Sequence, residues 1–364
     1  MSTSSGFPLL QLPLLALEPC VNMMNPNTVL ELALHSEQCK SRFSIVKYKI
    51  DSVEWRMTDD RTGVIIKSNF ADWYFSIKTP SEFDNIMRQK GLQVESINLN
   101  GTRLSLAKRV ESGRIYFWLM DSDDSFESKT DILKNLTNVL MRFVRSSKFQ
   151  LEYSLVKNVL SKDFFVWKYL NGNPIDLIVF RNRHPLTMTP DDIKFLFENL
   201  KFGQLVLDIN VSNPFFIYQG CLEAKILLIN GGNLRMDLRN MNCQKVLYKN
   251  AESIEETLKN WIQGSSMEKL EFLEISHQEN INPDGILNGL KHENTRFFHE
   301  DISKQTEGFD ISNDCVLQDI QRESDGRWGT VCLDFQWRRL YFIVWTPEKL
   351  AECCQETRIK LGFE

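Results

Sequence analysis

The sequence predicts a mixed fold of the α+β and α/β classes. Three N-terminal helices precede a mainly antiparallel sheet region, an irregular leucine-rich-repeat-like α/β solenoid and a closing C-terminal β-hairpin. Three observations support this prediction: apolar residues recur at helical spacing near the N-terminus, then at strand spacing, and then in short strands every ~20–30 residues. The expected parts of the chain are residues 7–43, 44–120, 125–305, 306–347 and 348–364, the last forming a tail helix.

Residues 7–43 carry three signals for the start of a helix. Pro13 fits the first helical position, where a missing N–H costs nothing, while Asn25 can cap a second helix and Ser36 a third. Segments below about 40 residues rarely bury enough surface to be stable alone. We therefore expect part of the apolar surface of these helices to be covered by another protein.

The spacing of apolar residues changes after Phe43. Val46 and Tyr48 begin a series of runs in which apolar and polar residues alternate. This pattern is typical of antiparallel sheet with one covered face. We expect sheet over residues 44–120 and a solvated loop in the acidic stretch 121–124.

The middle of the chain alternates helices with short strands. Thr189 and Pro190 begin one predicted helix, and Ser253 begins another that Gly264 ends. The expected strands near these helices lie at residues 205–207, 226–229, 246–248 and 270–275. This order favours a solenoid whose strands form one parallel curved sheet. Because the spacing is uneven and the repeat consensus is absent, an ordinary doubly wound α/β domain is the alternative.

Composition indicates a globular protein that works inside the cell. The 364 residues are 42% hydrophobic and 25% charged, with a net charge of −5 of interspersed sign, which gives no electrostatic case for nucleic acid. No apolar run approaches the ~18 residues that span a membrane. The N-terminal stretch lacks a basic start, and Pro8, Pro13 and Pro19 interrupt it, unlike a signal peptide. We expect a cytoplasmic or nuclear protein with reduced cysteines and no membrane partner.

Motifs that carry catalysis are missing. The sequence contains no P-loop, no dinucleotide fingerprint, no nucleophile elbow and no zinc-protease motif. Gly231-Gly232 lacks the lysine of a phosphate cradle, and the five histidines lack the spacing of a zinc site. We expect no catalytic residue, no cofactor and no metal. A hydrolase or transferase would need a cleft of convergent acids, bases or nucleophiles, which the sequence does not show.

Three stretches resemble one family when they are taken together. The first, FPLLQLPLLALEPCVNMMNPNTVLELALHSEQCKSRF, resembles an F-box, the helical module that docks on the Skp-type adaptor of cullin-RING ubiquitin ligases. The second, TLKNWIQGSSMEKLEFLEISHQ, resembles the central signature of the type-2 F-box-associated domain of nematode F-box families. Residues 317–347 resemble the closing hairpin of the same families.

This resemblance implies a non-catalytic substrate receptor of an SCF-type E3 ligase, with the Skp adaptor, a cullin and an unknown protein target as partners. The predicted adaptor-binding residues are apolar and come from the F-box-like stretch: Leu12, Pro13, Leu17, Leu30 and Leu34. Target binding is expected on the outward positions of the parallel strands, at Val206 and Asp208. The aromatic strand 341–345 is expected to pair with the N-terminal sheet.

A second hypothesis keeps the binding role without the ligase. In that case residues 7–43 form a cap on a solenoid interaction module, since solenoids need covered ends. A cap would turn the predicted leucines inward, whereas an adaptor-binding module leaves an apolar face open.

Overall fold

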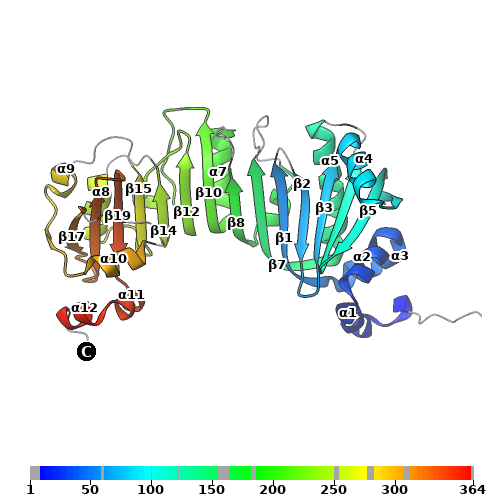
Figure 1. The fold of residues 1–364 in the computed structure, drawn as a ribbon, viewed down its shortest axis with the longest axis horizontal. Coiled ribbons are helices and arrows are strands. Elements are labelled where there is room, and N and C mark those ends of the chain that lie inside the picture. The colour runs from blue at the N-terminus through cyan, green and yellow to red at the C-terminus, as the bar shows by residue number, and fades with distance from the viewer. Residues whose placement is uncertain are drawn as a thin grey trace, which may run out of the picture. The chain divides into compact units, whose positions relative to one another are not determined.

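The computed structural model divides the chain into two compact units, Met1–Lys157 with Asp163–Asp176 (unit 1) and Asn158–Lys162 with Leu177–Glu364 (unit 2) (Figure 1). The structure describes residues 9–58, 61–99, 101–120, 123, 125–154, 164–181, 186–249, 254–276, 283–306, 311, 312 and 314–361. Several positions used above lie outside this set: Pro8, most of the acidic stretch 121–124, and Ser253.

Unit 1 begins with three short helices after a 3₁₀ turn, η1 (Leu9–Gln11): α1 (Leu14–Met23), α2 (Pro26–His35) and α3 (Glu37–Val46). The start of α3 agrees with its predicted cap, whereas Pro13 lies one residue before the first helical position expected for it. Pro13 stands immediately before α1, and the Ser36 hydroxyl accepts a hydrogen bond from the Cys39 amide at the start of α3. Pro19 lies within α1, and the helix continues past it to Met23.

The rest of unit 1 is built on a seven-stranded mixed sheet in the order β7-β1-β2-β3-β6-β5-β4. Its strands are β1 (Tyr48–Thr58), β2 (Thr62–Lys67), β3 (Asp72–Lys78), β4 (Val94–Leu99), β5 (Thr102–Glu111), β6 (Arg114–Met120) and β7 (Val144–Ser154). β1 pairs in parallel with β7, and β3 in parallel with β6, while the other pairs are antiparallel.

Helices α4 (Pro80–Lys90) and α5 (Phe126–Phe143) make the crossovers of unit 1, and α6 (Trp167–Leu170) follows the sheet. α4 begins at a capping box in which Thr79 and Glu82 satisfy each other's backbone amides. α5 contacts α3 and strands β2, β3, β4 and β7. The fully buried Trp55 of β1 donates its ring N–H to Thr137 of α5 at 3.1 Å, which satisfies the one polar atom of a large core side chain.

Unit 2 contains the remaining strands. They are β8 (Pro174–Phe180), which crosses the unit boundary, β9 (Leu186–Met188), β10 (Lys201–Val211), β11 (Ile217–Tyr218), β12 (Ala224–Gly231), β13 (Arg235–Met236), β14 (Lys245–Tyr248), β15 (Phe272–Ser276), β16 (His292–Asn294), β17 (Val316–Gln321), β18 (Trp328–Asp334) and β19 (Arg339–Val344). The helical elements are α7 (Pro190–Asn199), η2 (Leu238–Asn240), α8 (Ile254–Ile262), α9 (Pro283–Leu287), α10 (His299–Gln305), α11 (Pro347–Glu352) and α12 (Gln355–Lys360).

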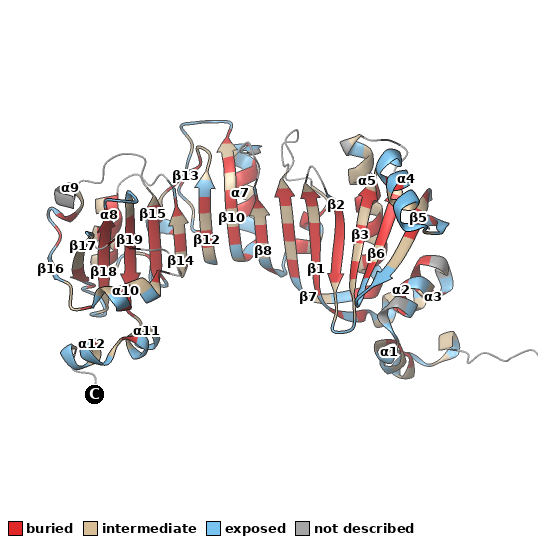
Figure 2. Cartoon of the chain, in the orientation of Figure 1, coloured by how far each residue is buried: buried red, intermediate tan, exposed pale blue. Residues whose placement is uncertain are grey.

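The main sheet of unit 2 has a parallel half and an antiparallel half. β9, β10, β12, β14 and β15 pair in parallel, in that order. β15 then pairs antiparallel with β19, and the order continues through β18 and β17 to β16. β11 and β13 form a separate two-stranded parallel sheet. In the sheet of unit 1 and in the main sheet of unit 2, most strand residues are buried or half-buried, whereas exposed residues are found mainly on helices and loops (Figure 2).

The fold class predicted from the sequence is wrong. In the described part of the chain, 17 strands belong to mixed sheet that contains both parallel and antiparallel pairs. Neither unit is a solenoid closed by a hairpin. Within residues 44–120 the pairs β1–β2, β2–β3, β4–β5 and β5–β6 are antiparallel, as expected there, whereas β3 pairs in parallel with β6. The parallel pair of β1 with β7 joins this region to a strand beyond it. Alternation of apolar residues shows which face a strand buries, but it does not identify the strand's neighbour or its direction.

The expected pairing of the aromatic strand is wrong as well. β19 lies between β15 and β18, so both of its edges are occupied within unit 2. Tyr341, Phe342 and Ile343 are fully buried there. The argument that so apolar a strand cannot remain an exposed edge holds, but a neighbour in the same unit covers it.

Candidate functional site

The structure divides the five predicted adaptor-binding residues between core and surface. Leu17 and Leu30 are fully buried and Leu34 is 8% exposed, whereas Leu12 is half-buried and Pro13 is exposed. The three buried leucines belong to the apolar core of unit 1. They therefore stabilise the helices from inside, and only the Leu12–Pro13 end of the predicted set reaches the surface.

Other apolar residues of α1 are exposed instead. Leu14 is 43%, Leu15 90% and Met23 78% exposed. Together with Leu12 and Pro13, the first turn of α1 presents an apolar segment over residues 12–15, which we call the α1 patch. Sequence reasoning missed Leu15 because it lies off the Leu17-containing stripe. The signal was present, since apolar residues on more than one side of a short helix cannot all enter one core.

Polar contacts hold the start of the α1 patch and the neighbouring helix α2 against the rest of unit 1. The Arg42 guanidinium of α3 donates hydrogen bonds to the carbonyl oxygens of Leu10 and Leu12, at 2.9 and 2.8 Å from one nitrogen. The Lys108 ammonium of β5 forms an ion pair with Glu31 of α2, which ties the helices to the sheet. A partner would meet a surface that is already ordered, so binding would cost little conformational entropy.

A second surface lies on the sheet of unit 2. Val206 pairs with Leu228, and Leu228 with Leu247, so these residues of β10, β12 and β14 share one face. All three are half-buried, whereas their chain neighbours Leu205 and Leu227 on the opposite face are fully buried. We call the row of Val206, Leu228 and Leu247 the apolar row.

The same face is covered where the sheet continues. Glu274 of β15 lies next in register after Leu247, and Tyr341 of β19 follows; both are buried. Phe272, Ile302 and Trp345 are among the residues of an apolar cluster here, and Leu247 packs at its margin. The face is thus accessible along β10, β12 and β14 and closed by side chains along β15 and β19.

Glu274 marks the boundary between the accessible and the covered part. Burial raises the pKa of its carboxyl, and the Arg339 guanidinium at 3.4 Å offsets part of the rise. One carboxyl oxygen accepts a hydrogen bond from Ser276, while the other is buried without a partner. Glu274 is only 5% exposed and therefore belongs to the interior of the sheet face.

The predicted target-binding residues lie at the edge of the apolar row. Val206 belongs to the row and Asp208 is half-buried one position further along that face of β10. A register irregularity between Leu207 and Asp208 turns the Asp208 carboxylate toward Gly231, where a Cβ would lie 2.4 Å from its oxygen. The sequence identified Val206 correctly as outward-facing but missed Leu228 and Leu247, whose strands are apolar on both faces.

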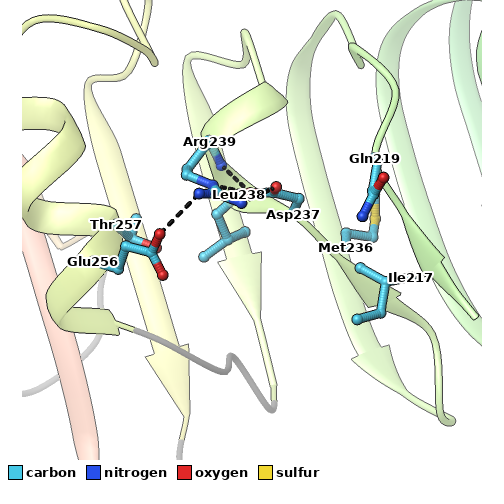
Figure 3. A pocket seen from close by; sticks show the side chains of 8 residues that line it. All are labelled: Ile217, Gln219, Met236, Asp237, Leu238, Arg239, Glu256 and Thr257. Atoms are coloured by element: carbon cyan, nitrogen blue, oxygen red, sulfur yellow. Dashed lines mark hydrogen bonds and ion pairs between the residues drawn. The ribbon is translucent and has the colours of Figure 1, made fainter. Parts of the chain in front are cut away.

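A small cavity of about 160 Å³ lies between η2 and α8 (Figure 3). The Arg239 guanidinium donates to both oxygens of Asp237 at 2.8 and 2.6 Å and to Glu256 at 2.8 Å. Hydrogen bonds from Arg239 lower the pKa of the Asp237 carboxyl. Arg239, Asp237 and Glu256 thus pair with one another, and this network clamps η2 to α8.

The described residues hold no group of three or more histidine, cysteine, aspartate or glutamate side chains that could bind a metal ion. Among the helices of the described segments, none is long and apolar enough to span a bilayer. Comparison of the chain with models of protein families, with curated proteins and with solved structures gives no match. The function proposed below is argued from the two apolar surfaces.

Proposed function

We propose that the protein is a substrate-recognition subunit of an SCF-type cullin-RING ubiquitin ligase, active in the cytoplasm or nucleus. The exposure of the α1 patch is the observation that carries this proposal, because Leu14 and Leu15 remain open to solvent on helices that already have a buried core. The resemblance of residues 7–43 to an F-box supplies the partner, a Skp-type adaptor, and through it a cullin.

The proposed role needs no catalytic residue. A receptor of this kind holds a target lysine near the charged ubiquitin-conjugating enzyme and so raises the effective concentration of the reacting groups. In this proposal unit 1 binds the adaptor through the α1 patch, and unit 2 binds the target protein through the apolar row.

A second candidate is an interaction module without a ligase role, in which α1–α3 only cover one end of the sheet. The burial of Leu17, Leu30 and Leu34 favours it, because a cap turns its leucines inward. The two candidates differ in what they expect of the α1 patch. Leu15 is 90% exposed. A cap does not explain this exposed leucine, whereas an adaptor-binding module needs exposed apolar side chains to contact its partner.

The test is binding of the purified full-length protein to a purified Skp-type adaptor, measured by size-exclusion chromatography and titration calorimetry. Replacing Leu14→Asp and Leu15→Asp should abolish the complex, since central interface anchors contribute about 2 kcal/mol or more each. The matched control changes Phe70→Asp and Val94→Asp, two residues of unit 1 outside α1 that are 71% and 51% exposed.

The control variant should bind like wild type. Substitutions at Leu17 or Leu30 are unsuitable for this purpose, because a buried aspartate would unfold the helices. Wild-type binding by the Leu14/Leu15 variant, or no complex with the unaltered protein, would refute the ligase proposal and leave the cap hypothesis.

A further inference from the structure

A larger cavity, of about 610 Å³, opens in unit 2 at the amino ends of three parallel strands. Lys201 begins β10, Ala224 begins β12, and Gln244 stands immediately before β14; all three line the cavity. The end of α7 supplies an apolar wall through Phe197 and Leu200. Its volume lies within the range of ligand-binding clefts in proteins, about 300–1,000 Å³.

Some charged side chains at this cavity have partners of opposite charge, and others do not. Glu223 accepts a hydrogen bond from the Asn242 amide at 3.1 Å and lies 3.6 Å from the Lys269 ammonium, so its charge is neutralised within the wall. Lys201 and Lys225 are exposed and form no ion pair with any residue in the described ranges.

The positive charge at the cavity is a local exception. Three lysines and two glutamates line it, while the whole chain has a net charge of −5. The second glutamate, Glu198, leaves an excess of one positive charge in the lining. A concave, partly apolar site with unpaired ammonium groups attracts carboxylates and disfavours cations.

We infer that this cavity binds an acidic peptide segment of a protein partner. Lys201 and Lys225 would pair with carboxylates of the segment, and the wall of Phe197 and Leu200 would contact an apolar neighbour. The lining contains lysines and no arginine. A lysine ammonium pairs with a carboxylate as a flexible point charge, whereas bidentate binding of phosphate uses the planar guanidinium of arginine.

The cavity lies close enough to the apolar row for one extended peptide to contact both. Phe202 lines the cavity, and Val206 of the apolar row lies four residues further along β10, about 13 Å away at strand rise. An extended segment of about four residues spans that distance. Acidic residues in the cavity could thus be followed by apolar residues on the row. This inference names the kind of target segment and rests on the proposed function for its biological meaning.

The experiment uses the purified full-length protein without adaptor and two pools of fluorescein-labelled dodecapeptides, with binding followed by fluorescence anisotropy. One pool combines aspartate and glutamate with leucine and phenylalanine, and the other replaces the acids by asparagine and glutamine. The acidic pool should bind saturably, and the amide pool at least about tenfold more weakly. Changing Lys201→Glu and Lys225→Glu should weaken binding of the acidic pool by a similar factor.

The matched control changes Lys194→Glu and Lys249→Glu, two exposed lysines of unit 2 outside the cavity lining, and should keep wild-type affinity. If the glutamate pair at the cavity perturbs folding, as seen by circular dichroism, Lys201→Gln with Lys225→Gln replaces it. No binding of the acidic pool, equal binding of both pools, or equal losses in both variants would overturn the inference. Loss of adaptor binding in the earlier test would leave this result unaffected, so the two proposals fail separately.

Discussion

Gly232 occupies a turn that excludes every other residue. Its φ is +77°, and a Cβ built at this position would lie 1.6 Å from the carbonyl oxygen of Ile209 in β10. The glycine pair that follows the predicted strand at 226–229 therefore serves backbone packing, where β12 ends against β10. Its role is structural and needs no phosphate ligand.

We expect Gly232→Ala to destabilise unit 2 by about 2 kcal/mol or more, because the methyl group forces the backbone of β10 and β12 apart at a position that already requires positive φ. Urea unfolding followed by circular dichroism measures this loss. Gly91→Ala is the matched control, since Gly91 also has a positive φ but has no atom within 4 Å of its added Cβ. Equal losses in the two variants would contradict the packing argument.

Lys349 near the start of α11 is half-buried, and its amine has two defined partners. Its ammonium nitrogen donates to the carbonyl oxygens of Glu271 and Val344, at 2.7 and 3.2 Å, and so joins α11 to the sheet. Burial, aided by the nearby Lys245, lowers the pKa of this group from 10.5 to about 8, although Glu271 and Glu352 oppose the shift. The folded protein therefore releases this proton at a lower pH than the unfolded chain.

Between pH 8 and 10.5 unfolding takes up a proton at Lys349, so the free energy of unfolding should rise with pH across that window. The contribution is of the order of 1–3 kcal/mol. We expect Lys349→Met to remove this rise, which makes its curve flatter than that of wild type. Chemical denaturation at several pH values measures both curves. Parallel curves for the two proteins would show that Lys349 titrates normally in the folded state.

At the scale of elements, β19 supports the sheet of unit 2 from its middle. It separates β15 from β18, and its side chains Tyr341, Phe342 and Val344 are fully buried. A chain without it would expose the unpaired edges of two apolar strands, which template aggregation.

We predict that deleting the chain from Asp325 onward, which removes β18 and β19, yields aggregated protein. A deletion from Gln355 onward removes α12 and leaves every strand of the described structure, so it should remain dispersed, with a lower melting temperature. Sedimentation and thermal melting distinguish the two. A monomeric, cooperatively melting product of the longer deletion would show that the hairpin is an appendage.

Local signals located individual helices well. The Thr189-Pro190 start is confirmed as α7, where Thr189 and Asp192 form a capping box; Ile193 and Leu196 lie on the buried face of this helix. Such signals act within a few residues of chain, so a single sequence contains them fully. For the candidate site they identified outward-facing Val206 and the surface position of Pro13, but not which leucines of α1 stay exposed.

At the scale of the whole molecule, both proposed surfaces depend on how strands and helices of each unit come together. The α1 patch exists because Leu17, Leu30 and Leu34 are buried in the core of unit 1, whereas Leu14 and Leu15 lie outside this core. The apolar row exists because Val206, Leu228 and Leu247 align in register across three parallel strands. Neither arrangement can be read from one segment alone.

The sequence by itself determined where several helices start, the alternation of inward and outward residues along β10, and that no catalytic motif is present. These properties follow from caps, spacing and side-chain polarity, which are local. The tertiary structure decided the parallel pairing of Tyr48 with Val144 in unit 1, the insertion of β19 between β15 and β18, and the exposure of Leu15. Those outcomes depend on contacts between residues far apart in the chain, where several pairings bury similar apolar surface and only the packing of the complete unit selects one.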